Sequence, residues 1–392
     1  MTLDKFLLEK SIHWTYVKLD LGIDLIKEYI NEKDINRRRE LTLEFFKILH
    51  KRHFLRFSNS HQFLMNLKKF EEDFLYKYLY YRDHLIHSFQ IFLLGCYIVE
   101  RANVESLPID FFSNMNRFLR TWFLISFYHD IGYMVEKLID LGIEIQNTYF
   151  ERIGGIKLSE IKLTISDDLD KIFKDYMKIL TEGIIIGEKN KFILEKNNVR
   201  EEQKKIIYNE LLENYKMRDH GIMSSLFLFY TIYLDIDSLH DETLKVQYLQ
   251  ELNIACCAIA IHSIEKQRKI YINFMKNHFG CLLILCDNIQ EWNRPRLKGL
   301  KLYEMGFWES LEIEVDTDNK CYKFLFKLHD SFSNEDIEAL VKHYFPELER
   351  IFLSTFVQGN NFLFSLKKDS FEWKLTASYD ESSRIYKINY SP

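Results

Sequence analysis

Histidine and aspartate side chains occur in this sequence at several places where the surrounding residues are apolar. The most distinctive place is the run 121–137, which carries His129 and Asp130 side by side. Burying both polar groups in an apolar helical run is costly unless something compensates them. A divalent cation would compensate both, because imidazole and carboxylate together suit Mn, Fe, Zn, Ni or Mg. We therefore take this run as the centre of a candidate metal site.

The His-Asp dipeptide is by itself a weak indication. The chain has 13 histidines, and further His-Asp pairs occur at 240–241 and 329–330. The pair at 240–241 lies in a polar stretch, and the pair at 329–330 lies between a predicted strand and a predicted helix. Only the pair at 129–130 lies in an apolar helical run, so the metal hypothesis depends on partners elsewhere in the chain.

Four other apolar helical segments each supply one candidate ligand. These candidates are His87, His220, His262 and Asp287. Each histidine taken singly has a simpler explanation, since a buried histidine is commonly a hydrogen-bonded core residue. The simpler explanation is weaker for Asp130 and Asp287, because an unpaired buried carboxylate is expensive.

The order of these segments resembles the HD-domain metal-dependent phosphohydrolase superfamily. The resembling segments, over about residues 82–292, are HLIHSFQIF, FYHDIGY, RDHGIMSS, AIAIHSIE and LILCDNIQEW. In that family an all-helical core brings His, His-Asp and a distal Asp around one divalent metal, and members with extra histidines hold a second metal. The extra-histidine pattern here is similar to that of HD-GYP phosphodiesterases and of the HD nucleases of CRISPR systems.

The resemblance implies a ligand set for two metal ions. The first ion would be held by His87, His129, Asp130 and Asp287. The second would be held by His220 and His262, with Asp130 bridging the two. Two metals about 3.5–4 Å apart would generate a hydroxide and hold both oxygens of an in-line displacement at phosphorus.

The sequence departs from the HD-GYP pattern at one position. That group has a lysine soon after His-Asp-x-Gly, where this chain has Tyr133, and the Gly-Tyr-Pro signature is absent. Assignment as a cyclic-di-GMP phosphodiesterase therefore does not follow. Lys137, one turn later, could partly replace the missing cation and take part in catalysis.

Further polar residues lie beside the ligand segments. Asp83 sits one turn before His87, where it could orient that ligand or act as a proton donor. His84 is expected to pack or orient rather than to bind metal. Four arginines are candidate phosphate clamps, with plain surface salt bridges as the alternative. They are Arg82, Arg218, Arg294 and Arg296.

The length and composition predict a mainly α protein of more than one domain. The chain has 392 residues, with only 13 glycines and 4 prolines, which favours long helices. We expect an N-terminal helical extension at 1–80, an all-helical HD core at 81–300 and a small α+β domain at 305–392. A more polar stretch at about 141–217 is predicted to be an insertion on the surface of the core, where it could act as a lid or as a specificity element.

The C-terminal region changes from helical to alternating periodicity. The predicted strands are 311–315, 322–328, 362–366, 371–377 and 384–390. Ser333 and Asp336 predict a helix start, with an end near Pro346 and a second helix running to about Phe356. No catalytic constellation is evident there, so we expect these strands to serve regulation or formation of a homodimer.

Charge and cysteine usage limit the classes of partner and compartment. The net charge is -5, which gives no overall drive toward nucleic acid. None of the 6 cysteines forms a C-x-x-C pair, which indicates buried thiols in a reducing compartment. No uncharged apolar run reaches about 18 residues, so we expect a cytoplasmic protein without a membrane span.

Together these features predict a metal-dependent phosphohydrolase or phosphodiesterase. Its substrate would be a phosphate ester of a nucleotide or of single-stranded nucleic acid, cleaved by metal-activated hydroxide. A small nucleotide is favoured over duplex DNA because the net charge is negative. One alternative is a single-strand nuclease of the HD type. Another is a non-catalytic nucleotide-sensing or interaction module that keeps the metal site for stability.

Overall fold

A computed structural model describes the chain in separate stretches, and the structural findings concern those stretches alone. The described residues are 3–8, 23–53, 62, 65, 66, 69, 70, 83–101, 115–136, 173, 176–181, 183, 184, 186, 187, 197–216, 219–268, 271, 272, 277–290, 308–316, 318, 320–330, 332–355, 361–380 and 385–391.

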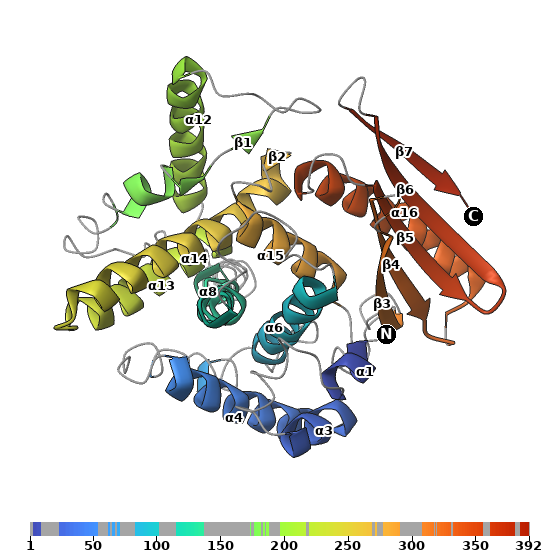
Figure 1. Ribbon diagram of the computed structural model, residues 1–392, viewed down its shortest axis with the longest axis horizontal. Helices are drawn as coiled ribbons and strands as arrows, with labels where there is room; N and C mark the ends of the chain where they lie inside the picture. The colour runs from blue at the N-terminus through green and yellow to red at the C-terminus, as the bar shows by residue number, and fades with distance from the viewer. Residues whose placement is uncertain are drawn as a thin grey trace, which may run out of the picture.

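The described chain is mainly helical, with a five-stranded sheet at its C-terminal end (Figure 1). The helices before the sheet are α1 (Leu3–Leu8), α3 (Ile23–Asn31), α4 (Ile35–His53), α6 (His84–Arg101), α8 (Met115–Tyr128), α12 (Asn197–Lys216), α13 (His220–Asp237), α14 (Glu242–Arg268) and α15 (His278–Ile289). The C-terminal elements are β3 (Trp308–Asp316), β4 (Cys321–Leu328), α16 (Asn334–Thr355), β5 (Asn361–Lys368), β6 (Phe371–Asp380) and β7 (Ile385–Ser391). The prediction of a helical protein with an appended α+β region is confirmed.

Helix α8 is the centre of the helical part. It packs against α6, α13, α14 and α15, and Figure 1 shows it nearly end-on between them. Its side chains from Thr121 to Tyr128 are all buried, as expected for a helix surrounded by others. Trp122 packs across Gly95 of α6, where an added Cβ would lie 2.2 Å from the indole ring, and its Nε1 donates to the Phe92 carbonyl at 3.0 Å. Glycine at position 95 therefore sets the close spacing of α6 and α8.

The sheet has the order β3-β4-β5-β6-β7, and β4 and β5 are parallel while the other pairs are antiparallel. The parallel pair requires a crossover, which α16 supplies. The predicted break of this helix at Pro346 is wrong, since α16 continues through it to Thr355. Phe345 and Leu348 on either side of the proline are buried, and this burial offsets the lost backbone hydrogen bond.

The sheet is attached to the helical part through its edge strand β3. The Tyr97 hydroxyl of α6 donates to the Leu311 carbonyl at 3.3 Å and accepts from the Ile313 amide at 3.2 Å. Trp308 is fully buried, and its Nε1 donates to the Ile289 carbonyl, the last residue of α15, at 2.8 Å. The edge of β3 therefore contacts the two helices α6 and α15.

The predicted insertion 141–217 is described only in part. The described part includes α12 and the short strand β1 (Ile186–Gly187), which pairs antiparallel with β2 (Tyr271–Ile272) just after α14. The predicted role of the insertion as a lid stays a prediction. Among the described helices, none combines the length and apolar character needed to cross a bilayer.

A buried ion pair joins α8 to α14. Glu251 of α14 is fully buried, and Arg120 of α8 donates to its two carboxylate oxygens at 2.6 and 2.9 Å. We expect Glu251→Ala to lower the free energy of unfolding by about 2 kcal/mol, because charge-assisted hydrogen bonds are lost in a buried place. Chemical denaturation measures this change. Glu309→Ala, which removes an exposed carboxylate, should leave stability nearly unchanged, and equal effects of the two substitutions would contradict this account.

Candidate metal centre

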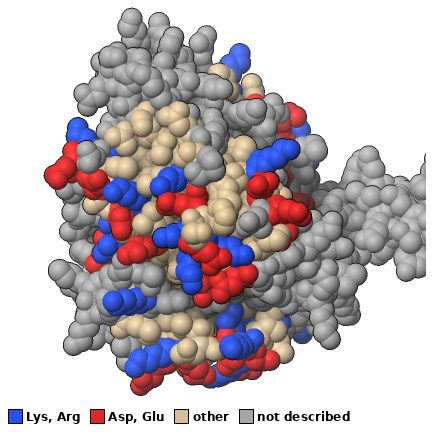
Figure 2. Space-filling view, turned by 90° about the vertical axis from the view of Figure 1, so that its right-hand side faces the viewer, with Lys and Arg blue, Asp and Glu red and all other residues tan. Residues whose placement is uncertain are grey.

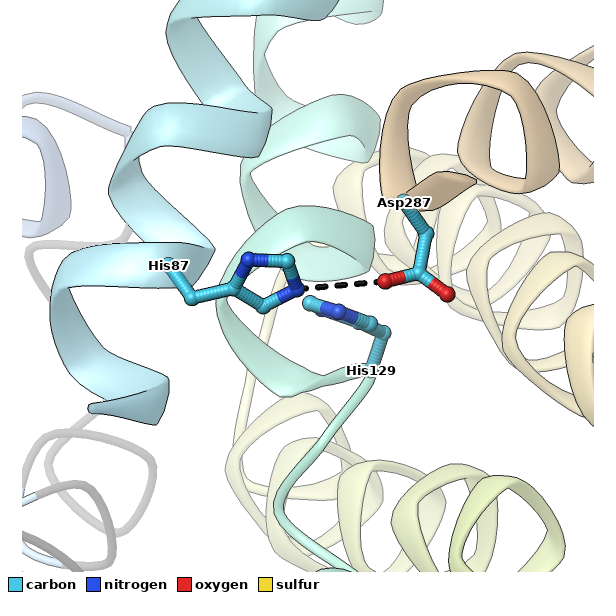
Figure 3. A group of neighbouring side chains, drawn as sticks. All are labelled: His87, His129 and Asp287. Carbon is cyan, nitrogen blue, oxygen red and sulfur yellow. Dashed lines mark hydrogen bonds and ion pairs between the residues drawn. The ribbon is translucent and has the colours of Figure 1, made fainter. Parts of the chain in front are cut away.

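The six predicted ligands gather in two groups of three. The first group is His87, His129 and Asp287, and the second is Asp130, His220 and His262. Within each group the potential ligand atoms lie within 4.8 Å of one another. Figure 3 shows the first group, in which His87 Nε2 lies 3.1 Å from Asp287 Oδ1 and the His129 ring lies beside this pair. Segments up to 200 residues apart are thus brought to one place.

His129 and Asp130 do not lie within a helix, contrary to the prediction. Helix α8 ends at Tyr128, and residues 129–132 form a turn before a short helical stretch at 133–136. The turn allows two adjacent residues to serve different groups, His129 the first and Asp130 the second.

Glycine at position 132 makes this turn possible. Its amide donates to the Ser224 hydroxyl at 2.7 Å, and a Cβ added to it would lie 1.9 Å from the His220 carbonyl oxygen. Gly221 plays a similar part, since a Cβ there would lie 2.5 Å from Ser263 Cβ. These glycines therefore allow close packing between the turn after α8, the start of α13 and the end of α14.

All four histidines of the two groups form a hydrogen bond through the same ring nitrogen, Nδ1. The acceptors of Nδ1 are Gln290 Oε1 at 2.6 Å for His87, the Ser126 carbonyl at 2.8 Å for His129, Glu136 Oε2 at 3.2 Å for His220 and the Ile259 carbonyl at 2.5 Å for His262. A neutral imidazole that donates from Nδ1 has its lone pair on Nε2. Metal-binding histidines have this arrangement, because the other ring nitrogen is used for orientation.

Gln290 is itself fixed by a second amide. Its Nε2 donates to Gln90 Oε1 at 2.7 Å, so its Oε1 is the atom that accepts from His87. Sequence reasoning missed Gln290 and Glu136. Gln290 could have been found, because it follows Asp287 by three residues at the end of the same helix. Glu136 gave no such signal, since only the turn brings it to His220.

Asp130 lies between the two groups. Its Oδ2 is 3.3 Å from His129 Nε2 and 3.6 Å from His87 Nε2, although it belongs with His220 and His262. Burial by itself raises the pKa of Asp130, but His129 and His87 outweigh it and hold the pKa well below its usual range. Burial likewise lowers the pKa of His129, but Asp130 and Asp287 reverse this effect and leave the pKa raised.

The donor set fits a divalent cation. In the part of the chain that the structure describes, Nε2 of His129 and Nε2 of His220 are buried and have no hydrogen-bond partner. Buried polar atoms are nearly always satisfied, so two such nitrogens next to carboxylates call for an explanation. A cation at each group would supply it. The buried His and Asp groups could therefore hold metal ions.

Asp83 lies in neither group. Its Oδ1 accepts from the Ile86 amide at 2.8 Å at the start of α6, and its Oδ2 forms a buried ion pair with Arg39 of α4. These contacts fix α6, which carries His87, against α4. The predicted role of Asp83 in proton transfer stays a prediction.

Tyr133 occupies a defined place beside the second group. Its ring stacks on His220 with centroids 4.0 Å apart and on His84 with centroids 4.9 Å apart. Tyr133 therefore supports the ring of the candidate ligand His220. The other predicted catalytic and phosphate-binding residues lie outside the described part of the chain. They are Lys137, Arg82, Arg218, Arg294 and Arg296.

Comparison with known proteins adds no relative. No family model, no curated protein and no solved structure matches the chain. The assignment of the site therefore depends on its own residues and geometry.

The close approach at Gly132 can be tested by substitution. We expect Gly132→Ala to weaken Mn²⁺ binding by about 10–100-fold, because the new Cβ would push the turn that carries Asp130 away from α13. Isothermal titration calorimetry measures the affinity. Gly280→Ala on α15 is the control, since its Cβ would meet only side-chain atoms of Ile261, at 3.3 Å. Unchanged affinity in a folded Gly132→Ala protein would contradict the packing argument.

Metal binding should also depend on pH. His129 must lose the proton on Nε2 to bind a cation. Because its pKa is raised above the ordinary histidine value of about 6.5, protons compete with the cation at a higher pH than they would at an ordinary histidine. We expect the Mn²⁺ affinity to fall as the pH is lowered, beginning above about pH 6.5. Calorimetry in buffers of different ionisation enthalpy measures both affinity and proton release. The exposed-histidine variant His240→Asn should give the same profile, whereas a pH-independent affinity would refute the assignment of His129.

Proposed function

We propose that the chain is a metal-dependent phosphohydrolase of the HD type that uses two divalent ions. The observation that carries the proposal is the common arrangement of the four histidines. Each is held at Nδ1 and has Nε2 as the nitrogen left for a metal, and two carboxylates complete the groups. Separate structural histidines in a core would not be expected to share one tautomer and one meeting point.

The chain's own residues would hold the ions and the reacting groups in place. Asp130 would bridge, since it lies within 3.6 Å of the first group's histidines and belongs to the second group. When bound, two divalent ions supply an acidified water and positive charge for the oxygens of a phosphate ester. The buried surroundings of Asp130 and His129 would keep other water away and strengthen these charge interactions.

The net charge and the mixed charge on the sheet face both favour a small nucleotide over duplex nucleic acid. Figure 2 shows the face that carries the sheet, where basic and acidic side chains are interspersed. On the sheet, Lys327 lies 2.5 Å from Glu309 and Lys323 lies 3.5 Å from Asp316, so these cations already have acidic neighbours. Binding to a long phosphate backbone depends on a continuous basic surface. The pairing of these cations and the net charge of -5 together support a small substrate, such as a nucleotide, rather than a long nucleic acid.

The test is hydrolysis of bis-p-nitrophenyl phosphate by the purified chain with Mn²⁺, followed by cyclic and linear nucleotides, dNTPs and single-stranded DNA and RNA. We expect metal-dependent hydrolysis that Asp130→Asn reduces by at least about 100-fold, since loss of a ligand should exceed the loss of a group that merely orients one. Asp241→Asn is the matched control, because it changes the exposed His-Asp pair at 240–241.

The outcomes separate the rival functions. Activity confined to single-stranded DNA or RNA would favour the nuclease. Bound metal without hydrolysis of any substrate under any divalent ion would rule out the enzyme and favour a nucleotide-sensing or interaction module. Full activity of Asp130→Asn would show that the site is wrongly assigned.

A further inference from the structure

The ring of His220 is held from two sides by the residues that follow Asp130. Glu136 Oε2 lies 3.2 Å from His220 Nδ1. Tyr133 stacks on the same ring at 4.0 Å between centroids, with an interplanar angle of 12°. The short segment 130–136 therefore supplies one member of the second group and fixes another. A hydrogen bond and a stacked ring together restrict both the position and the rotation of an imidazole.

Glu136 differs from the groups that hold the other three histidines. His129 and His262 are held by backbone carbonyls, and His87 is held by the neutral amide of Gln290. Among these four acceptors only Glu136 is a charged side chain, and its side chain is 35% exposed. His220 is also the most exposed of the four histidines, at 12%. In the second group, His220 is thus held by a half-buried carboxylate, whereas His262 and both histidines of the first group are held by neutral groups in the core of the protein.

We propose that Glu136 is the positioning residue of the second metal group and that it determines whether this group is occupied. The inference rests on the proposed function, because it takes the two groups as two metal sites. The Glu136 carboxylate keeps the hydrogen on Nδ1 of His220 and so keeps the lone pair on Nε2. Without Glu136 the ring can adopt the other tautomer or turn away, and Asp130 and His262 remain as an incomplete set.

Two ions should therefore bind with different sensitivity to Glu136. The His87, His129 and Asp287 group should bind its ion with unchanged affinity in a Glu136 variant. The Asp130, His220 and His262 group should bind its ion about 10–100-fold more weakly, as when a carboxylate that orients a ligand histidine is removed. Glu136→Gln should recover much of this loss, because its amide oxygen can still accept from Nδ1.

The test is metal binding by the full chain, with Co²⁺ and Mn²⁺ as probes. Calorimetry gives the number of ions and their affinities, and the visible absorption of Co²⁺ reports the geometry at each step. We expect two binding steps in the unaltered protein, one weakened step in Glu136→Ala and a largely restored step in Glu136→Gln. Glu213→Ala, an exposed carboxylate on α12, is the matched control.

Several results would overturn the inference. These are a single ion in the unaltered protein, two unchanged steps in Glu136→Ala, equal weakening of both steps, and no recovery in Glu136→Gln. Failure of the proposed function is distinguishable from these results. A protein that binds two ions, loses one in Glu136→Ala and hydrolyses no phosphate ester would refute the enzyme but support the role of Glu136.

Discussion

The main physical constraint on this structure is that four histidines and two aspartates lie inside an apolar helical bundle, where their burial costs free energy. His129 and His262 are fully buried, and Asp130 is nearly so. Isolated polar groups in such surroundings would destabilise the fold. The protein offsets this cost in two ways. It ties each Nδ1 to an oxygen, and it turns the remaining nitrogens and carboxylates toward one another, where a cation can join them.

Small residues allow the elements that carry the candidate ligands to come that close. Gly132 and Gly221 remove the side chains that would otherwise separate the turn after α8 from α13 and α14. Gly95 does the same for α6 and α8. At Gly132 the neighbouring atoms belong to the backbone of His220 and Ser224, which adjusts less readily than side chains. Tyr133 then stacks on the ring of His220 and restricts its orientation.

The C-terminal sheet is physically connected to the first group. Trp308 of β3 donates to the Ile289 carbonyl, and the next residue, Gln290, accepts from His87. Asp287 lies on the same last turn of α15. The end of α15 thus carries the candidate ligand Asp287, accepts from the candidate ligand His87 through Gln290, and accepts the Trp308 hydrogen bond that anchors the sheet. This connection gives the appended region a part in supporting the helical core, in addition to the dimerisation or regulation that its strands were predicted to serve.

Periodicity and the cost of buried charge are local properties, so the helical segments, the alternating C-terminal strands and the residue types of the candidate ligands could all be predicted from the sequence. It predicted His87 and Asp287 on their helices, and the Ser333–Asp336 start of α16. Three further features came from the packing of distant segments: α8 ends before His129, α16 continues through Pro346, and Glu136 contacts the candidate ligand His220. These outcomes depend on which distant backbone lies alongside, at Ser224, His220 or α15, and no local pattern contains that information.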